Sequence, residues 1–118
     1  MTDPIRIANC SGFFGDRPSG AQEMVEGGPI DVLTGDWLAE LTMLILSRIK
    51  AKNPTGGYAR TFVQQMEEVM GTCLDKGIKV VTNAGGLAPA GCADAVAEVA
   101  AKLGLSPTIA YVDGDDLL

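Results

Sequence analysis

The sequence predicts an α/β fold with three layers, in which helices cover both faces of a mostly parallel sheet of about four strands. Two observations carry this prediction. Short β-branched runs alternate with longer stretches that have helical spacing, and this alternation is typical of parallel sheets with crossover helices. The runs are apolar almost throughout, which indicates strands that are buried on both sides.

Four runs have the length and composition of strands, and each ends in Gly, Asp, Asn, Ser or Thr. A change from β-branched to turn-forming residues is a typical strand end. The predicted strands span residues 5–9, 29–34, 78–82 and 108–112.

Helices are predicted over residues 18–26, 37–50, 59–76 and 89–103. Pro18 and Pro89 suit a first helical turn, where a missing N–H costs nothing. Asp36 suits the N-cap of the second helix, whose apolar residues form one wide face. Gly77 and Gly104 follow the last two helices, as C-capping glycines do.

These elements predict a Rossmann-like domain, because strands and helices alternate from the first run to the last. The fourth strand is followed by six residues and no covering helix. Residues 1–118 are therefore expected to be the N-terminal part of a longer α/β domain, incomplete at the C-terminus. By themselves they would leave an open sheet edge and apolar surface, so we expect them to oligomerise or aggregate.

Composition and charge argue against some classes of function. The 118 residues carry a net charge of −6 and no Lys/Arg cluster, which argues against nucleic-acid binding, since that needs a basic surface. The chain has no histidine, so it lacks the commonest general base near neutral pH and the commonest transition-metal ligand. Acid–base chemistry within these residues would fall to Asp, Glu, Lys, Tyr or Cys.

The cysteines and the apolar stretches indicate where in the cell the protein is located. Cys10, Cys73 and Cys92 have no CxxC spacing, which is typical of reduced thiols in a cytoplasmic protein. The N-terminus has no signal pattern. The longest apolar stretch, residues 37–49, is broken by two charges and is shorter than the ~20 residues of a membrane span. We therefore expect a soluble protein.

All strands of a parallel α/β sheet end at one edge, so the residues that follow each strand should gather there. Arg17 could bind a carboxylate or phosphate bidentately, and a tight turn with a solvated Asp16–Arg17 pair is the alternative. Cys10 has no histidine to activate it and is interpreted as a small core residue. The ligand-binding candidates after the first strand are Asn9, Ser11, Gly12, Phe13, Gly15 and Arg17.

Around the second strand the candidates are Asp31, Thr34, Gly35 and Asp36. An acid just past a strand end can hold a ribose hydroxyl, a metal ion or a proton, and it can equally cap the next helix. Capping is the minimum role of Asp36, and a catalytic base or metal ligand is its candidate role.

The glycine loop after the third strand supplies Asn83, Ala84, Gly85, Gly86 and Leu87. It lacks the Lys-Ser/Thr pair of a nucleotide triphosphate loop and departs from GxGxxG. What remains is a nest of N–H donors beside a helix N-terminus, which suits an anionic oxygen. Simple turn chemistry is the alternative.

Residues 113–116, after the fourth strand, hold three carboxylates. They repel one another unless a divalent cation or bulk water intervenes. Asp115 is the candidate base or metal ligand here, and a solvated acidic tail is the alternative.

Four phrases carry a resemblance to a known family. Together they resemble the N-terminal part of the acyclic terpene utilisation protein AtuA family, once catalogued as a domain of unknown function. The resemblance runs over nearly the whole chain and implies a longer protein. The phrases are IANCSGFFGDRP (7–18), EGGPIDVLTGD (26–36), TNAGGLAPAG (82–91) and VDGDDL (112–117).

The resemblance implies a part in bacterial catabolism of citronellol and geraniol, where intermediates travel as CoA thioesters, and it supplies no catalytic residues. One hypothesis is an enzyme, or half of one, that acts on a small carboxylate or acyl-CoA. The glycine loop and Arg17 would hold the anion, and Asp36 or Asp115 would be the base or metal ligand. The other is a non-catalytic partner of a carboxylase or hydratase, with Phe13 and Phe14 as docking surface.

Overall fold

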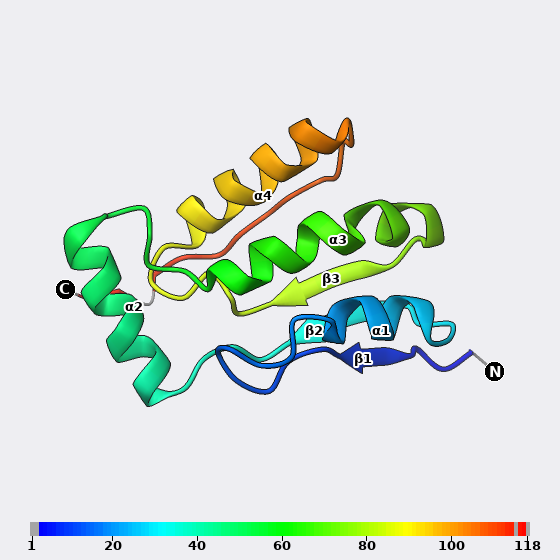
Figure 1. The fold of residues 1–118 in the computed structure, drawn as a ribbon, viewed down its shortest axis with the longest axis horizontal. Helices are drawn as coiled ribbons and strands as arrows, with labels where there is room; N and C mark the ends of the chain where they lie inside the picture. The colour runs from blue at the N-terminus through cyan, green and yellow to red at the C-terminus, as the bar shows by residue number, and fades with distance from the viewer. Residues whose placement is uncertain (1–2, 115, 118) are drawn as a thin grey trace.

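The computed structural model describes residues 3–114, 116 and 117. The chain is a mixed α/β structure, as its alternating pattern predicts (Figure 1). Its elements are β1 (Ile7–Asn9), α1 (Gly20–Glu26), β2 (Val32–Gly35), α2 (Glu40–Lys52), α3 (Arg60–Lys76), β3 (Lys79–Thr82) and α4 (Pro89–Leu103).

The described strands form one parallel sheet in the order β1-β2-β3. Ala8 pairs with Leu33 in the first ladder, and Leu33 pairs with Val80 in the second. The parallel arrangement and the first three strands of the sequence prediction are therefore confirmed. All three strands point the same way, so their carboxyl ends share one edge (Figure 1).

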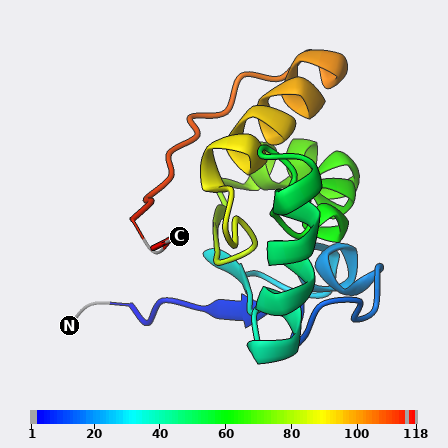
Figure 2. The same cartoon turned by 90° about the vertical axis from the view of Figure 1, so that its left-hand side faces the viewer.

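Helices on both faces of the sheet, as in a Rossmann-like domain, are not confirmed. Crossovers between parallel strands are right-handed, so strands added in one direction place their helices on the same face. Accordingly α1 packs against β1, β2 and α3, and α1 and α3 lie on the same side of the strands (Figure 2). On the other face, Ile7 and Val81 are 64% and 60% exposed.

The predicted fourth strand is also not confirmed. Residues 108–112 form no strand, and within the described part no backbone hydrogen bond joins them to β3. The segment after α4 instead runs back along that helix (Figure 1), with Val112 92% exposed. A β-branched sequence favours extended backbone, but a strand needs a ladder partner to satisfy its N–H and C=O groups.

The second helix starts later than predicted, and it does not pack on a face of the sheet. It begins at Glu40 after Ala39, and it lies across the carboxyl ends of the strands (Figure 2). Trp37, predicted as its first residue, is instead buried before the helix, where its ring meets Phe62 edge-on at 6.1 Å between centroids.

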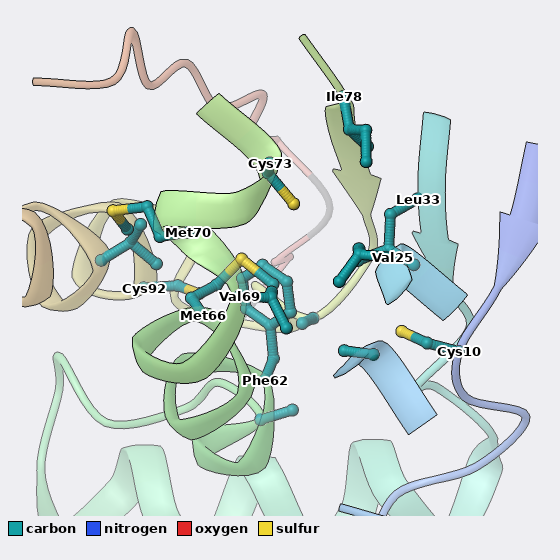
Figure 3. Packing of buried hydrophobic residues seen from close by; sticks show 14 of the residues in the cluster. Cys10, Val25, Leu33, Phe62, Met66, Val69, Met70, Cys73, Ile78 and Cys92 are labelled. Atoms are coloured by element: carbon teal, nitrogen blue, oxygen red, sulfur yellow. The ribbon is translucent and has the colours of Figure 1, made fainter. Parts of the chain in front are cut away.

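The core fills the space between the covered face of the sheet and α3. Met66, Val69 and Cys73 project from α3 toward Val25 of α1 and Leu33 of β2 (Figure 3). Leu33 has no exposed surface. α4 packs on the outer side of α3, so α3 is the helix that joins the sheet to the last helical layer.

Gly91 in the first turn of α4 is in close contact with the loop before α3. A Cβ atom at Gly91 would lie 2.3 Å from the carbonyl oxygen of Thr55. We expect Gly91→Ala to lower the free energy of unfolding by about 1–3 kcal/mol, because the backbone must move to relieve the overlap. Urea denaturation measures this change.

Gly71→Ala in α3 is the matched control. Its Cβ would meet only Leu105, at an ordinary contact distance of 3.9 Å, and alanine favours a helix by about 1 kcal/mol over glycine. This variant should be as stable as the wild type or more stable. Equal stability of Gly91→Ala and the wild type would contradict the close contact.

Candidate functional site

Hydrogen bonds join the loops that follow the strands into one polar edge. The backbone N–H of Asp36 donates to the Ser11 carbonyl at 2.9 Å, which ties the loop after β2 to the loop after β1. Asn83, after β3, accepts from the Trp37 N–H at 2.8 Å through Oδ1 and donates to Asp36 Oδ1 at 2.8 Å through Nδ2. The predicted clusters after the first three strands therefore meet.

Asp16 accepts hydrogen bonds from two backbone N–H groups of the loop after β1. The N–H groups of Gly12 and Arg17 donate to the Asp16 carboxylate at 2.9 and 2.7 Å. These bonds hold the pKa of the Asp16 carboxyl below its usual value, and the bond from Gly12 has the largest effect. The Arg17 guanidinium lies 3.0 Å from a Glu23 carboxylate oxygen. Asp16 and Glu23 thus bind the Gly12 N–H and the Arg17 guanidinium, two of the groups predicted to hold a ligand.

The other candidates in this region take different places. Phe13 is 57% exposed, while Phe14 is packed against the core. Gly15 is exposed at the turn with φ of 89°. The side chains of Asn9 and Thr34 meet at 3.4 Å on neighbouring strands, and Asn9 also donates to the Ser11 carbonyl.

The candidate residues around β2 lie at opposite ends of the strand and have different roles. Asp31 precedes the strand and binds the Arg6 N–H at 2.8 Å, away from the polar edge. Gly35 has a packing role, because a Cβ there would lie 2.7 Å from Trp37 Nε1. The expected Asp36 cap is wrong: α2 has Ala39 as its N-cap residue and no side-chain cap bond. Asp36 is an exposed carboxylate oriented by Asn83.

The glycine loop uses several of the N–H donors predicted for a ligand in bonds within the protein. Three of its amides bond within the protein: Ala84 donates to Thr82 Oγ1 at 3.1 Å and Gly86 to the Asn83 carbonyl at 3.1 Å. Leu87 donates to the Gly57 carbonyl at 2.9 Å. Gly57 lies far away in the sequence, so the pattern of the loop could not reveal this acceptor.

A cavity of about 540 Å³ that is widely open to solvent lies beside this loop, between the 54–55 turn, the start of α4 and the C-terminal segment. Lys50 of α2 lies in its wall. The ammonium Nζ donates to the Leu87 carbonyl at 2.8 Å and forms an ion pair with Asp116. The lining residues are Lys50, Pro54, Thr55, Gly86, Leu87, Ala88, Pro89, Ala90, Gly91, Val112, Asp113, Gly114 and Asp116.

This cavity brings together the third and fourth predicted clusters. Lys50 was not predicted, because a lysine in the last turn of an amphipathic helix has no feature that separates it from a solvated one. Asp115 lies outside the described residues. The described residues contain no group of three or more acids or cysteines placed to hold a metal ion.

The cysteines are core residues. Cys10, Cys73 and Cys92 are free and buried, which confirms the interpretation of Cys10. Burial raises the pKa of all three thiols, that of Cys92 to about 11. A neutral thiol is a poor nucleophile, so none of them is poised for covalent chemistry at neutral pH. Within the described part of the chain, no helix is long and apolar enough to cross a membrane.

Gln65 of α3 fixes the first loop to the core. Its side chain is buried, and its Nε2 donates to the carbonyl oxygens of Pro18 at 3.2 Å and Arg17 at 3.4 Å. Its Oε1 lies 4.0 Å from the Cys10 thiol. Sequence reasoning missed this role; the signal that could have found it is the place of Gln65 on an otherwise apolar helix face.

We expect Gln65→Ala to lower the free energy of unfolding by about 1–3 kcal/mol, since the loop carbonyls lose a buried donor. Urea denaturation provides the measurement. Gln64→Ala, at an exposed neighbouring position, is the matched control and should change stability by less than about 0.5 kcal/mol. If the two variants were equally stable, Gln65 would not anchor the loop.

Comparison with known proteins identifies a family. The model of the family described as "Acyclic terpene utilisation family protein AtuA" matches residues 5–118. No curated protein and no solved structure matches the chain. The match spans β1 to α4, the polar edge and the cavity around Lys50. This chain belongs to the acyclic terpene utilisation family AtuA.

Proposed function

We propose that this chain serves acyclic terpene utilisation by binding a small anionic intermediate, a carboxylate or its acyl-CoA thioester, at the carboxyl edge of its sheet. The observation that carries the proposal is the cavity of about 540 Å³ with the Lys50 ammonium in its wall. Small-molecule pockets typically measure about 300–1,000 Å³ and combine apolar walls with a few placed polar groups.

The cavity wall suits a molecule with an anionic head and a branched hydrocarbon tail. Pro54, Leu87, Pro89 and Val112 supply apolar surface, and Lys50 supplies the positive charge. The first turn of α4 adds backbone N–H groups at Ala90 and Gly91, which carry partial positive charge at a helix N-terminus. The glycine loop adds Gly86 and Leu87 to this wall.

Chemistry on the ligand would need a base at the same edge. Asp36 is the described candidate at that edge, because its carboxylate is exposed and held by Asn83. It lies outside the cavity lining, so only a ligand that extends beyond the cavity would reach it. Asp115 stays the second candidate from the sequence, and a divalent cation between ligand and carboxylates remains part of this proposal. The free thiols suit a reducing compartment, so we propose a cytoplasmic location.

A non-catalytic role is the second proposal, and a separate observation favours it. Ile7 and Val81 are more than half exposed on the uncovered face of the sheet, and Phe13 is exposed on its loop. Exposed apolar groups that cluster are typical of interaction surfaces. A companion subunit of a carboxylase or hydratase, or a second copy of the chain, would cover them.

Ligand-dependent melting tests the first proposal. Citronellate and citronellyl-CoA at 100 times their dissociation constants should stabilise the protein by about 2.7 kcal/mol, with and without Mg²⁺. Citronellol, which has the same hydrocarbon and no charge, is the matched control and should stabilise far less. Unchanged melting with both anions would count against a binding function and leave the partner role.

A further inference from the structure

We propose that Lys50 is the group that binds the ligand carboxylate in the cavity, and that Asp116 is an internal substitute which the ligand displaces. This inference rests on the proposed function and narrows it to one residue and one class of ligand, a free monocarboxylate. Its basis is the pair of contacts that the Lys50 ammonium makes, with the Leu87 carbonyl and with Asp116.

The first contact keeps the ammonium in the cavity wall independently of Asp116. Nζ donates to the Leu87 carbonyl at 2.8 Å, and that carbonyl belongs to the loop that Gly57 holds through the Leu87 N–H. A lysine ammonium has three N–H donors. One donates to the Leu87 carbonyl, and the others can donate to a carboxylate. Departure of Asp116 would therefore leave a positioned cation in the cavity.

The second contact, between Lys50 and Asp116, involves a segment that has few other attachments. From Ser106 to Gly114 no hydrogen bond or ion pair ties the described chain to the rest of the protein. Val112 and Leu117 are 92% and 93% exposed, so little packing holds them. The Lys50–Asp116 ion pair, with side chains 31% and 26% exposed, is one contact that attaches this segment to α2.

Exchange of one carboxylate for another is chemically balanced. The ligand carboxylate would replace the Asp116 carboxylate on the same ammonium, and Asp116 would gain full hydration in return. A ligand shifts such an equilibrium only by its difference in affinity for the two states. Here that difference comes from the apolar contacts that a hydrocarbon tail makes with Pro54 and Leu87, which Asp116 does not make.

The charges in the wall favour a single negative charge on the ligand. One cation, Lys50, faces two described carboxylates, Asp113 and Asp116. Once Asp116 is displaced, the wall holds Lys50 and Asp113, so a monocarboxylate leaves one net negative charge there and a doubly charged phosphate leaves two. The thioester of an acyl-CoA has no carboxylate to offer. The ligand of Lys50 is therefore the free acid.

Calorimetry with citronellate on a set of variants tests this inference. Asp116→Asn removes the competing carboxylate and should tighten binding at least threefold. Asp113→Asn removes the same charge from the same wall without breaking the ion pair, and it should tighten binding less than Asp116→Asn does. Lys50→Gln should weaken binding at least tenfold, and Lys50→Arg should restore most of it. Lys52→Gln on the same helix should have no effect.

Chymotrypsin cleavage after Tyr111, followed by mass spectrometry, reports on the segment itself. Saturating citronellate and the Asp116→Asn substitution should each speed this cleavage, while cleavage elsewhere should not change. Melting of each variant shows whether it is folded, so that weak binding by Lys50→Gln can be separated from unfolding.

The outcomes separate this inference from the proposed function. If the wild type binds citronellyl-CoA but not citronellate, the proposed function stands and this inference is wrong. The inference is also wrong if citronellate binds with equal affinity to Asp116→Asn, Lys50→Gln and the wild type. If neither compound binds, both are wrong.

Discussion

The amide of Asn83 is the contact on which the polar edge depends. It accepts the Trp37 N–H and donates to Asp36, so it ties the end of β3 to the end of β2. With its backbone held there, Trp37 turns its ring into the core against Phe62. The chain then enters α2 across the edge of the sheet, and α2 carries Lys50 to the Leu87 carbonyl.

The order of the strands explains the two unlike faces of the sheet. Strands added in one direction through right-handed crossovers leave all the covering helices on one side. The covered side becomes the core, with Leu33 fully buried, while Ile7 and Val81 stay exposed on the other. Because α1 and α3 stay on one side, no helix covers the other face of the described sheet (Figure 2).

The sequence predicts the features that depend on neighbouring residues. It fails for the features that depend on residues far away in the chain. β-branched runs that end in turn residues located β1, β2 and β3, and glycines located the ends of α3 and α4. The same signals at residues 108–112 gave a strand that does not form, because a ladder partner is a tertiary property. The donors of the glycine loop were predicted to be free, yet Gly57, about thirty residues away in the chain, accepts one of them. Lys50 and Gln65 acquire their roles only from the folded arrangement.

Exchange of backbone amide protons, followed by NMR, tests the joined edge most directly. The amides of Asp36 and Trp37 should both exchange slowly in the wild type, since each donates to an acceptor from another loop. In Asn83→Ala, exchange at Trp37 should become much faster, while Asp36, bonded to the Ser11 carbonyl, should stay slow. An unchanged rate at Trp37 in that variant, or fast exchange at both amides in the wild type, would contradict the account.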